Sequence, residues 1–205
     1  MNSRSAGLRE KVAREAATLL YFGLEKEYKQ AKLKAAFNVG VHIIPRNVEV
    51  AIELDSIAEE NEGASRFKRL VEMRTEALKL MKLLKTYRPL LLGSVWRGTI
   101  RHGSDIDIAV YGDDIEVASI LRKQKKLTVF RVERIVVVEQ GKPVPSVHIH
   151  LVTWKKYNAE VVVRSIEEAG KKRFCETFGD EMRGLRIGVL EKLLKTNPTQ
   201  RFVPF

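Results

Sequence analysis

The chain has little cysteine and no long apolar segment, and each of these shortages excludes some classes of protein. Cys175 is the one cysteine among 205 residues, so an intrachain disulfide and a multi-cysteine metal site are excluded. No apolar run approaches the ~20 residues that a membrane-spanning helix requires. The N-terminal residues also lack the apolar stretch of a signal peptide. We therefore expect a cytoplasmic protein with no membrane partner.

Acidic residues are few relative to basic ones. The chain has 37 Lys and Arg against 26 Asp and Glu, for a formal net charge of +11. The surplus is spread evenly, with 17 against 12 in residues 1–88 and 20 against 14 in residues 89–205. A basic excess favours polyanionic partners such as nucleic acid. It also favours solubility, so composition alone does not choose between the two.

The first part of the chain has the periodicity of helices. Apolar residues recur at three- and four-residue steps over 5–37, with Gly23 as an interruption. Further helices are predicted over 48–60 and 66–86, and Asn61-Glu62-Gly63 separates them. We assign residues 1–86 to a helical N-terminal region.

The pattern then changes to short strands. The predicted core, 87–155, alternates strands with one helix, and after Tyr157 the chain is expected to be mostly helical again, so 156–205 is assigned to a helical C-terminal region. The strands are predicted over 89–92, 105–111, 127–139 and 146–153, and the helix is predicted from Asp113 or Asp114 to about Gln124. This order predicts an α+β fold: a small mixed sheet flanked by N- and C-terminal helices.

Two carboxylates in the predicted core are candidates for a metal-binding role. Asp105 and Asp107 are two residues apart on a predicted strand, so both side chains emerge on one face. Carboxylates held side by side repel each other, and a divalent cation relieves that repulsion. Hard oxygen ligands suit Mg²⁺ or Mn²⁺. An Asp-x-Asp alone is usually a surface feature, but here Gly93 and Ser94 precede it.

Gly93-Ser94 ends the preceding strand and leads into a short helix. Such a turn offers backbone N–H groups and one hydroxyl, which is a phosphate-binding arrangement. Arg97 and Arg101 are candidates for contacts with phosphate oxygens, or are ordinary surface cations. Ser104 either binds phosphate or makes the turn before the strand. We interpret Trp96 as a packing residue rather than a base-stacking one.

These residues resemble the signature of the nucleotidyltransferase superfamily typified by DNA polymerase β. The form Gly93-Ser94-x-x-Arg97-Gly98, followed by Gly103-Ser104-Asp105-Ile106-Asp107, is similar to minimal nucleotidyltransferases and to archaeal tRNA CCA-adding enzymes. The flanks also resemble archaeal proteins described as predicted nucleotidyltransferases. The resemblance implies that Asp105 and Asp107 bind the metal. It also implies that Gly93, Ser94, Arg97 and Ser104 contact the nucleotide.

The resemblance also implies a third carboxylate on a later strand, in the pattern apolar–Asp–apolar–apolar. On the strand over 146–153 the expected position holds His150, with His148 on the same face. A neutral histidine can act as a base or metal ligand, so His150 is our candidate catalytic residue. The alternatives are Glu133 and Glu139, on the preceding strand.

The implied activity is transfer of a nucleoside monophosphate from a nucleoside triphosphate to an acceptor hydroxyl. The basic surplus favours RNA, such as tRNA, as the acceptor. The missing carboxylate supports an alternative: a nucleotidyltransferase-fold module without turnover that binds nucleotide or RNA. Neither the base, the acceptor nor the oligomeric state follows from the sequence.

Overall fold

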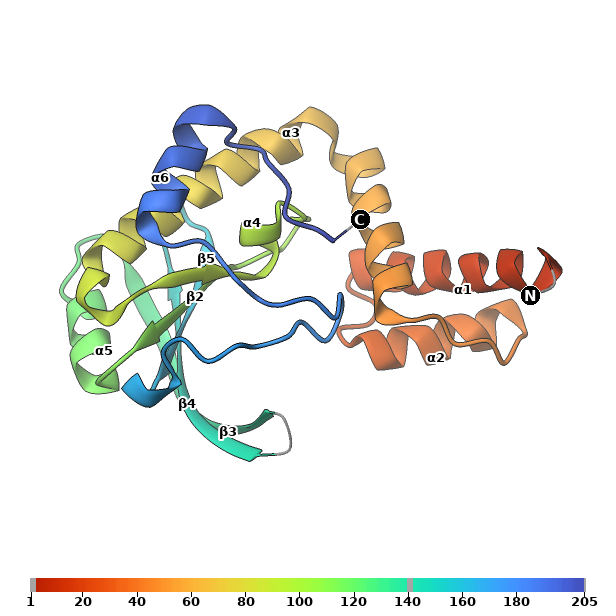
Figure 1. The fold of residues 1–205 in the computed structure, drawn as a ribbon. Coiled ribbons are helices and arrows are strands. Elements are labelled where there is room, and N and C mark those ends of the chain that lie inside the picture. The colour runs from red at the N-terminus through yellow and green to blue at the C-terminus, as the bar shows by residue number, and fades with distance from the viewer. Residues whose placement is uncertain (1–2, 140–141, 205) are drawn as a thin grey trace. The chain divides into compact units, whose positions relative to one another are not determined.

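The computed structural model describes residues 3–139 and 142–204, and the chain divides into two compact units (Figure 1). The first unit contains Met1–Arg66, Phe174–Asp180 and Pro204–Phe205, and the second contains Phe67–Arg173 and Glu181–Val203. No described helix is long and apolar enough to span a membrane.

The first unit is helical, as its periodicity predicts. It holds α1 (Ser3–Tyr21), α2 (Tyr28–Val39) and the beginning of α3 (Asn47–Leu83). Its core consists mainly of small and aliphatic residues from the three helices, among them Ala16, Leu20, Ala31, Ala35 and Val50.

Glycines interrupt the helices of this unit where the sequence predicts. Gly23 has a φ of 70°, which only glycine adopts readily, and it follows the end of α1. The helices predicted over 48–60 and 66–86 are consecutive parts of α3. Gly63, with φ 50° and ψ −139°, is the non-helical residue between them.

The second unit is built on a five-stranded mixed sheet in the order β1-β2-β5-β4-β3. Strand β2 runs parallel to β5, and the other neighbours are antiparallel. Its strands are β1 (Leu90–Leu92), β2 (Ile106–Tyr111), β3 (Thr128–Glu139), β4 (Lys142–Val152) and β5 (Asn158–Arg164), and its helical elements besides α3 are η1 (Lys85–Tyr87), α4 (Gly93–Arg97), α5 (Asp114–Arg122), η2 (Ile166–Glu168) and α6 (Ile187–Thr196). This architecture confirms the predicted fold class.

Helices cover one face of the sheet. Ile106, Ile108 and Val161 are fully buried and belong to the same core cluster as apolar residues of α3, α5 and α6; Figure 1 shows α3 and α6 on one side of the sheet. Because side chains alternate along a strand, the intervening residues of β2 and β5 lie on the opposite face. That face carries the functional side chains.

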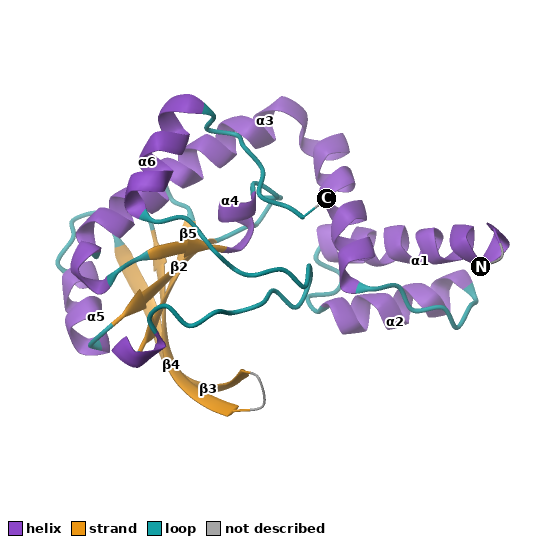
Figure 2. Cartoon of the chain, viewed as in Figure 1, coloured by secondary structure: helices purple, strands orange, loops and turns teal. Residues whose placement is uncertain are grey.

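The predicted helical C-terminal region is wrong for residues 158–164. They form β5, the central strand of the sheet, and Figure 2 shows mainly loop between η2 and α6. Residues 159, 161 and 163 of β5 are buried and alternate with partly exposed ones. That is the two-residue period of a strand, whereas a helix would bury residues at three- and four-residue steps.

Candidate active site

Three carboxylates lie together on the open face of the sheet. Asp107 on β2 stands directly opposite Glu160 on the parallel neighbour β5. Asp105 precedes β2 by one residue and shares the face of Asp107. The charge of Glu160 raises the pKa of both aspartates, so the three groups are near enough to repel one another.

The pKa of Asp107 is raised to about 7, chiefly by burial and then by the charges of Glu160 and Asp105. The pKa of the more exposed Asp105 is also raised, by lost contact with water and by Glu160. His150, a hydrogen bond from Asn158 and Arg101 act in the opposite direction on Asp105. Carboxylates that are buried and close together can bind one cation jointly. The positive charge of the cation would offset both the burial and the repulsion that raise their pKa values.

Gly93 is required where β1 passes into α4. Its φ is 63°, and a Cβ atom there would lie 1.8 Å from Oδ2 and 2.8 Å from Cγ of Asp107. Any side chain at this position would therefore displace the Asp107 carboxylate. The glycine allows the first turn of α4, which begins with Gly93 and Ser94, to approach the acidic group closely.

Two histidines of β4 contact Glu160 from the other side. His148 Nδ1 lies 2.7 Å from Glu160 Oε1, and His148 Nε2 lies 2.9 Å from Ser146 Oγ. An ionised carboxylate only accepts, so His148 donates from Nδ1 and accepts the serine hydroxyl at Nε2. His150 Nε2 is 3.2 Å from Glu133 Oε2 and 3.7 Å from Glu160 Oε1.

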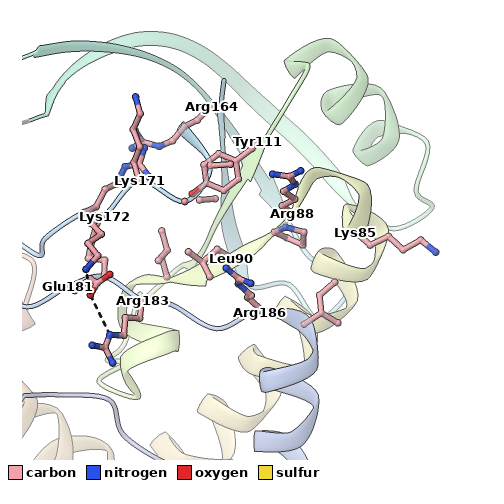
Figure 3. A pocket seen from close by; sticks show the side chains of 18 of the residues that line it. Lys85, Arg88, Leu90, Tyr111, Arg164, Lys171, Lys172, Glu181, Arg183 and Arg186 are labelled. Atoms are coloured by element: carbon pink, nitrogen blue, oxygen red, sulfur yellow. Dashed lines mark ion pairs between the residues drawn. The ribbon is translucent and has the colours of Figure 1, made fainter. Parts of the chain in front are cut away.

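A cavity of about 820 Å³ extends along the same face, beyond the carboxylates (Figure 3). Leu92 and Ala109 line it, and Leu92 pairs with Asp107 across β1 and β2. The lining contains eight Lys and Arg residues and a single carboxylate, Glu181. The open face thus joins an acidic site to a strongly basic cavity.

Comparison with known families agrees with this arrangement. Residues 73–173, about half of the chain, match the family described as the nucleotidyltransferase domain. This stretch is a nucleotidyltransferase domain. The match confirms the resemblance on which the motif was interpreted. It begins within α3 and ends beyond β5, so it extends past the 87–155 stretch assigned to the core from sequence.

The solved structures that match part of the chain include two complexes. One is "structure of GLD-2/RNP-8 complex", at 12% identity and a TM-score of 0.33, over 60% of this chain and 38% of that chain. The other is "Structure of the non canonical Poly(A) polymerase complex GLD-2 - GLD-3", at 12% identity and 0.32, over 58% and 40%. The chain thus spans about two fifths of those chains. No protein of curated function matches it in sequence.

Two residues that the resemblance implies as nucleotide contacts, Arg97 and Ser104, make contacts within the protein. Arg97 is only 4% exposed, donates from Nη1 to the Phe202 carbonyl at 3.0 Å and stacks 4.4 Å from the Trp96 ring centroid. Ser104 Oγ accepts the Arg101 backbone N–H at 2.9 Å, as a turn residue does. The geometry therefore favours structural roles for Arg97 and Ser104. Trp96 is 4% exposed and belongs to the core, as interpreted from sequence.

The sequence interpretation missed Glu160. It sought the third carboxylate on the strand over 146–153, but β5 lies between that strand, β4, and β2. Glu133 is on β3, farther still from β2, and bonds to His150 and Arg131. The side chain of Glu139 lies outside the described residues. The sequence does contain the expected pattern of apolar–Asp–apolar–apolar on β5. It is Ala159-Glu160-Val161-Val162, with Glu in place of Asp.

Proposed function

We propose that this chain transfers a nucleoside monophosphate from a nucleoside triphosphate to an acceptor hydroxyl, with Asp105, Asp107 and Glu160 as the catalytic carboxylates. The observation that carries the proposal is the placement of these three acids on one sheet face, in a nucleotidyltransferase domain, against the glycine that opens α4. Gly93 and Ser94 are proposed to face the phosphates.

The donor set fits a divalent ion in its chemistry. Asp105, Asp107 and Glu160 supply hard carboxylate oxygens, which suit Mg²⁺ or Mn²⁺. The pKa values of Asp105 and Asp107 are raised by burial and by nearby negative charge, both of which a cation would offset. Among the described residues, no three acidic, His or Cys side chains converge as a preformed metal site. Carboxylate rotation on binding is therefore part of the proposal. A bound ion would neutralise charge on the triphosphate and the leaving pyrophosphate.

The residues of the chain then have distinct roles in the transfer. The acceptor oxygen bonds to the α-phosphorus, while the bond from the α-phosphorus to the bridging pyrophosphate oxygen breaks. Glu160 is proposed to accept the acceptor's proton on Oε2, since Oε1 faces His148. His148 orients Glu160. His150, 3.7 Å from Glu160, is proposed as a secondary contributor rather than as the base.

The reason for the alternative hypothesis, a binding module without turnover, no longer holds. That hypothesis rested on the lack of an acid on β4, and Glu160 on β5 supplies one. We propose RNA as the acceptor class, because the basic cavity adjoins the carboxylates on the same face. A tRNA is one such acceptor.

The test is transfer from labelled nucleoside triphosphates, with Mg²⁺ or Mn²⁺, into total cellular RNA and protein. We expect label in RNA from the wild-type chain and none from Asp105→Asn/Asp107→Asn. Asp114→Asn is the matched control, because Asp114 pairs with Arg134 on the surface, at a distance of 2.5 Å. Equal labelling by the double variant, or no wild-type labelling with either metal, would refute the proposal.

A further inference from the structure

The basic cavity and the carboxylate site share a face but not residues. Neither Asp105, Asp107, Glu160 nor Gly93 lines the cavity. Its floor continues from the site through Ala109 and Tyr111, the next residues of β2 on the face of Asp107. From Asp107 to Tyr111 the strand rises ~13 Å. The cavity therefore begins beside the carboxylates and leads away from them along β2.

The cations of the cavity outnumber the acids that could neutralise them. Lys171 and Arg173 share Glu168, while Lys172 and Arg183 share Glu181. Each of these two carboxylates thus contacts two cations.

Three further cations, Lys85, Arg88 and Arg186, form no ion pair with any described residue, although all three line the cavity. Figure 3 shows Arg88 and Arg186 near Leu90, whereas the amino group of Lys85 points outward. Positive groups gathered around an apolar floor repel one another and attract a polyanion.

Arg88 also holds an unusual backbone conformation. Its φ of 49° and ψ of 55° lie in the left-handed region, which residues other than glycine adopt at a cost. It follows η1 and immediately precedes Pro89, whose ring restricts the residue before it. Non-glycine residues in this region gather at functional sites. An arginine where glycine would fit better indicates that its side chain is needed.

Resting on the proposed function, we infer that this cavity binds the acceptor itself, a single-stranded RNA segment leading to the reacting hydroxyl. A metal–triphosphate belongs with the carboxylates and Gly93, which the cavity does not include. The cations come from separate stretches, near residues 85–88, 164–173 and 183–186, and so suit successive phosphates rather than one compact group. Leu90 and the largely buried Tyr111 provide an apolar surface for a base.

Fluorescence anisotropy with a labelled single-stranded RNA oligonucleotide, without nucleotide or metal, tests the inference. The variant is Arg88→Gly/Arg186→Gln, in which glycine relieves the left-handed strain, so the fold should not suffer. The control is Arg122→Gln/Lys123→Gln, which removes the same charge from exposed positions at the end of α5.

We expect the cavity variant to lose at least tenfold in affinity for the oligonucleotide, with the control within about twofold. Two lost phosphate contacts should reduce the slope of log affinity against log salt by roughly 1.4, since each contact on a single strand contributes about 0.7. Affinity for the metal–triphosphate, measured by calorimetry, should stay within a few-fold.

Equal RNA affinities for the two variants would overturn the inference. Loss of triphosphate binding together with RNA binding would also overturn it, because the cavity would then be the nucleotide site. Competition by duplex DNA as effective as that by unlabelled RNA would show a general polyanion surface instead. The inference and the proposed function fail separately: RNA binding through Arg88 and Arg186 without transfer refutes only the activity, and transfer with unchanged RNA affinity in the variant refutes only the inference.

Discussion

Replacing Asp107 with asparagine should make the folded protein more stable at pH 8. Burial, Glu160 and Asp105 together raise the Asp107 pKa from 3.8 to about 7. Between pH ~4 and ~7 the folded state therefore binds more protons at this group than the unfolded chain does, so stability falls as pH rises through that window. Above pH ~7 Asp107 is charged in the folded state, and this buried charge lowers the stability by its full amount. The neutral amide side chain of the asparagine variant removes that loss.

The size of the effect follows from the shift. One pKa unit corresponds to about 1.4 kcal/mol, so a change from 3.8 to about 7 sets an upper limit of roughly 4 kcal/mol. The repulsion is shared with Asp105 and Glu160, which can relax, so we expect about 1–3 kcal/mol. For a chain of this size that corresponds to roughly 2–12 °C in Tm. Such a gain at the expense of function is typical of acidic active sites.

Thermal unfolding followed by tryptophan fluorescence measures the relevant transition, because both tryptophans, Trp96 and Trp154, lie in the second unit. At pH 8 Asp107→Asn should melt above the wild type, and at pH 5 the difference should be less than half as large, because part of the window between the two pKa values has already been crossed. A metal–triphosphate should raise the Tm of the wild type and not of the variant. Asp114→Asn should show neither effect. A Tm difference that is the same at both pH values would refute the electrostatic account.

The remaining predictions concern the same unit. Gly93→Ala should abolish metal–triphosphate binding in calorimetry, because its Cβ would displace the Asp107 carboxylate; normal binding would show that the acid adapts. Glu160→Gln should lower the transfer rate by about 10²–10⁴-fold, and a rate within tenfold would remove Glu160 as the base. His150→Ala should cost less than tenfold, and a loss matching that of Glu160→Gln would make His150 an equal partner. Arg74→Met should destabilise by roughly 3 kcal/mol or more in urea unfolding, because buried Arg74 donates to four backbone carbonyls; a smaller cost would mean that water replaces it.

Local patterns in the sequence were enough to predict much of the second unit. The Asp-x-Asp strand, the preceding Gly93 and the helix after Asp113 are all marked by residue patterns within a few positions of one another. Asp113 caps α5 by accepting the Glu116 N–H at 2.8 Å. In the first unit, the break at Gly63 likewise follows from the conformational freedom of one residue. Such features are decided within a few residues, so a sequence shows them directly.

Strand β5 could not be predicted in the same way. Its sequence, Asn158–Arg164, leads into Ser165 and the glutamates of η2, a stretch with as many helix-forming as strand-forming residues. What makes it a strand is pairing on both sides, with β2 and with β4. Those partners are distant in sequence. Long-range pairing overrode local preference here, and the error placed the sheet's central strand in a helical region.

The same error explains why His150 of β4 was interpreted as a substitute for a carboxylate. Once β5 lies between β2 and β4, the position opposite Asp107 belongs to Glu160, and His148 and His150 become its neighbours from the far side. A glutamate carries one more methylene than the aspartate expected there, so its carboxylate has more rotamers to lose on being fixed. The 2.7 Å contact from His148, itself held by Ser146, restricts that freedom. The histidines therefore fit the needs of a glutamate at this position, and their presence is an argument for an intact third carboxylate rather than for its loss.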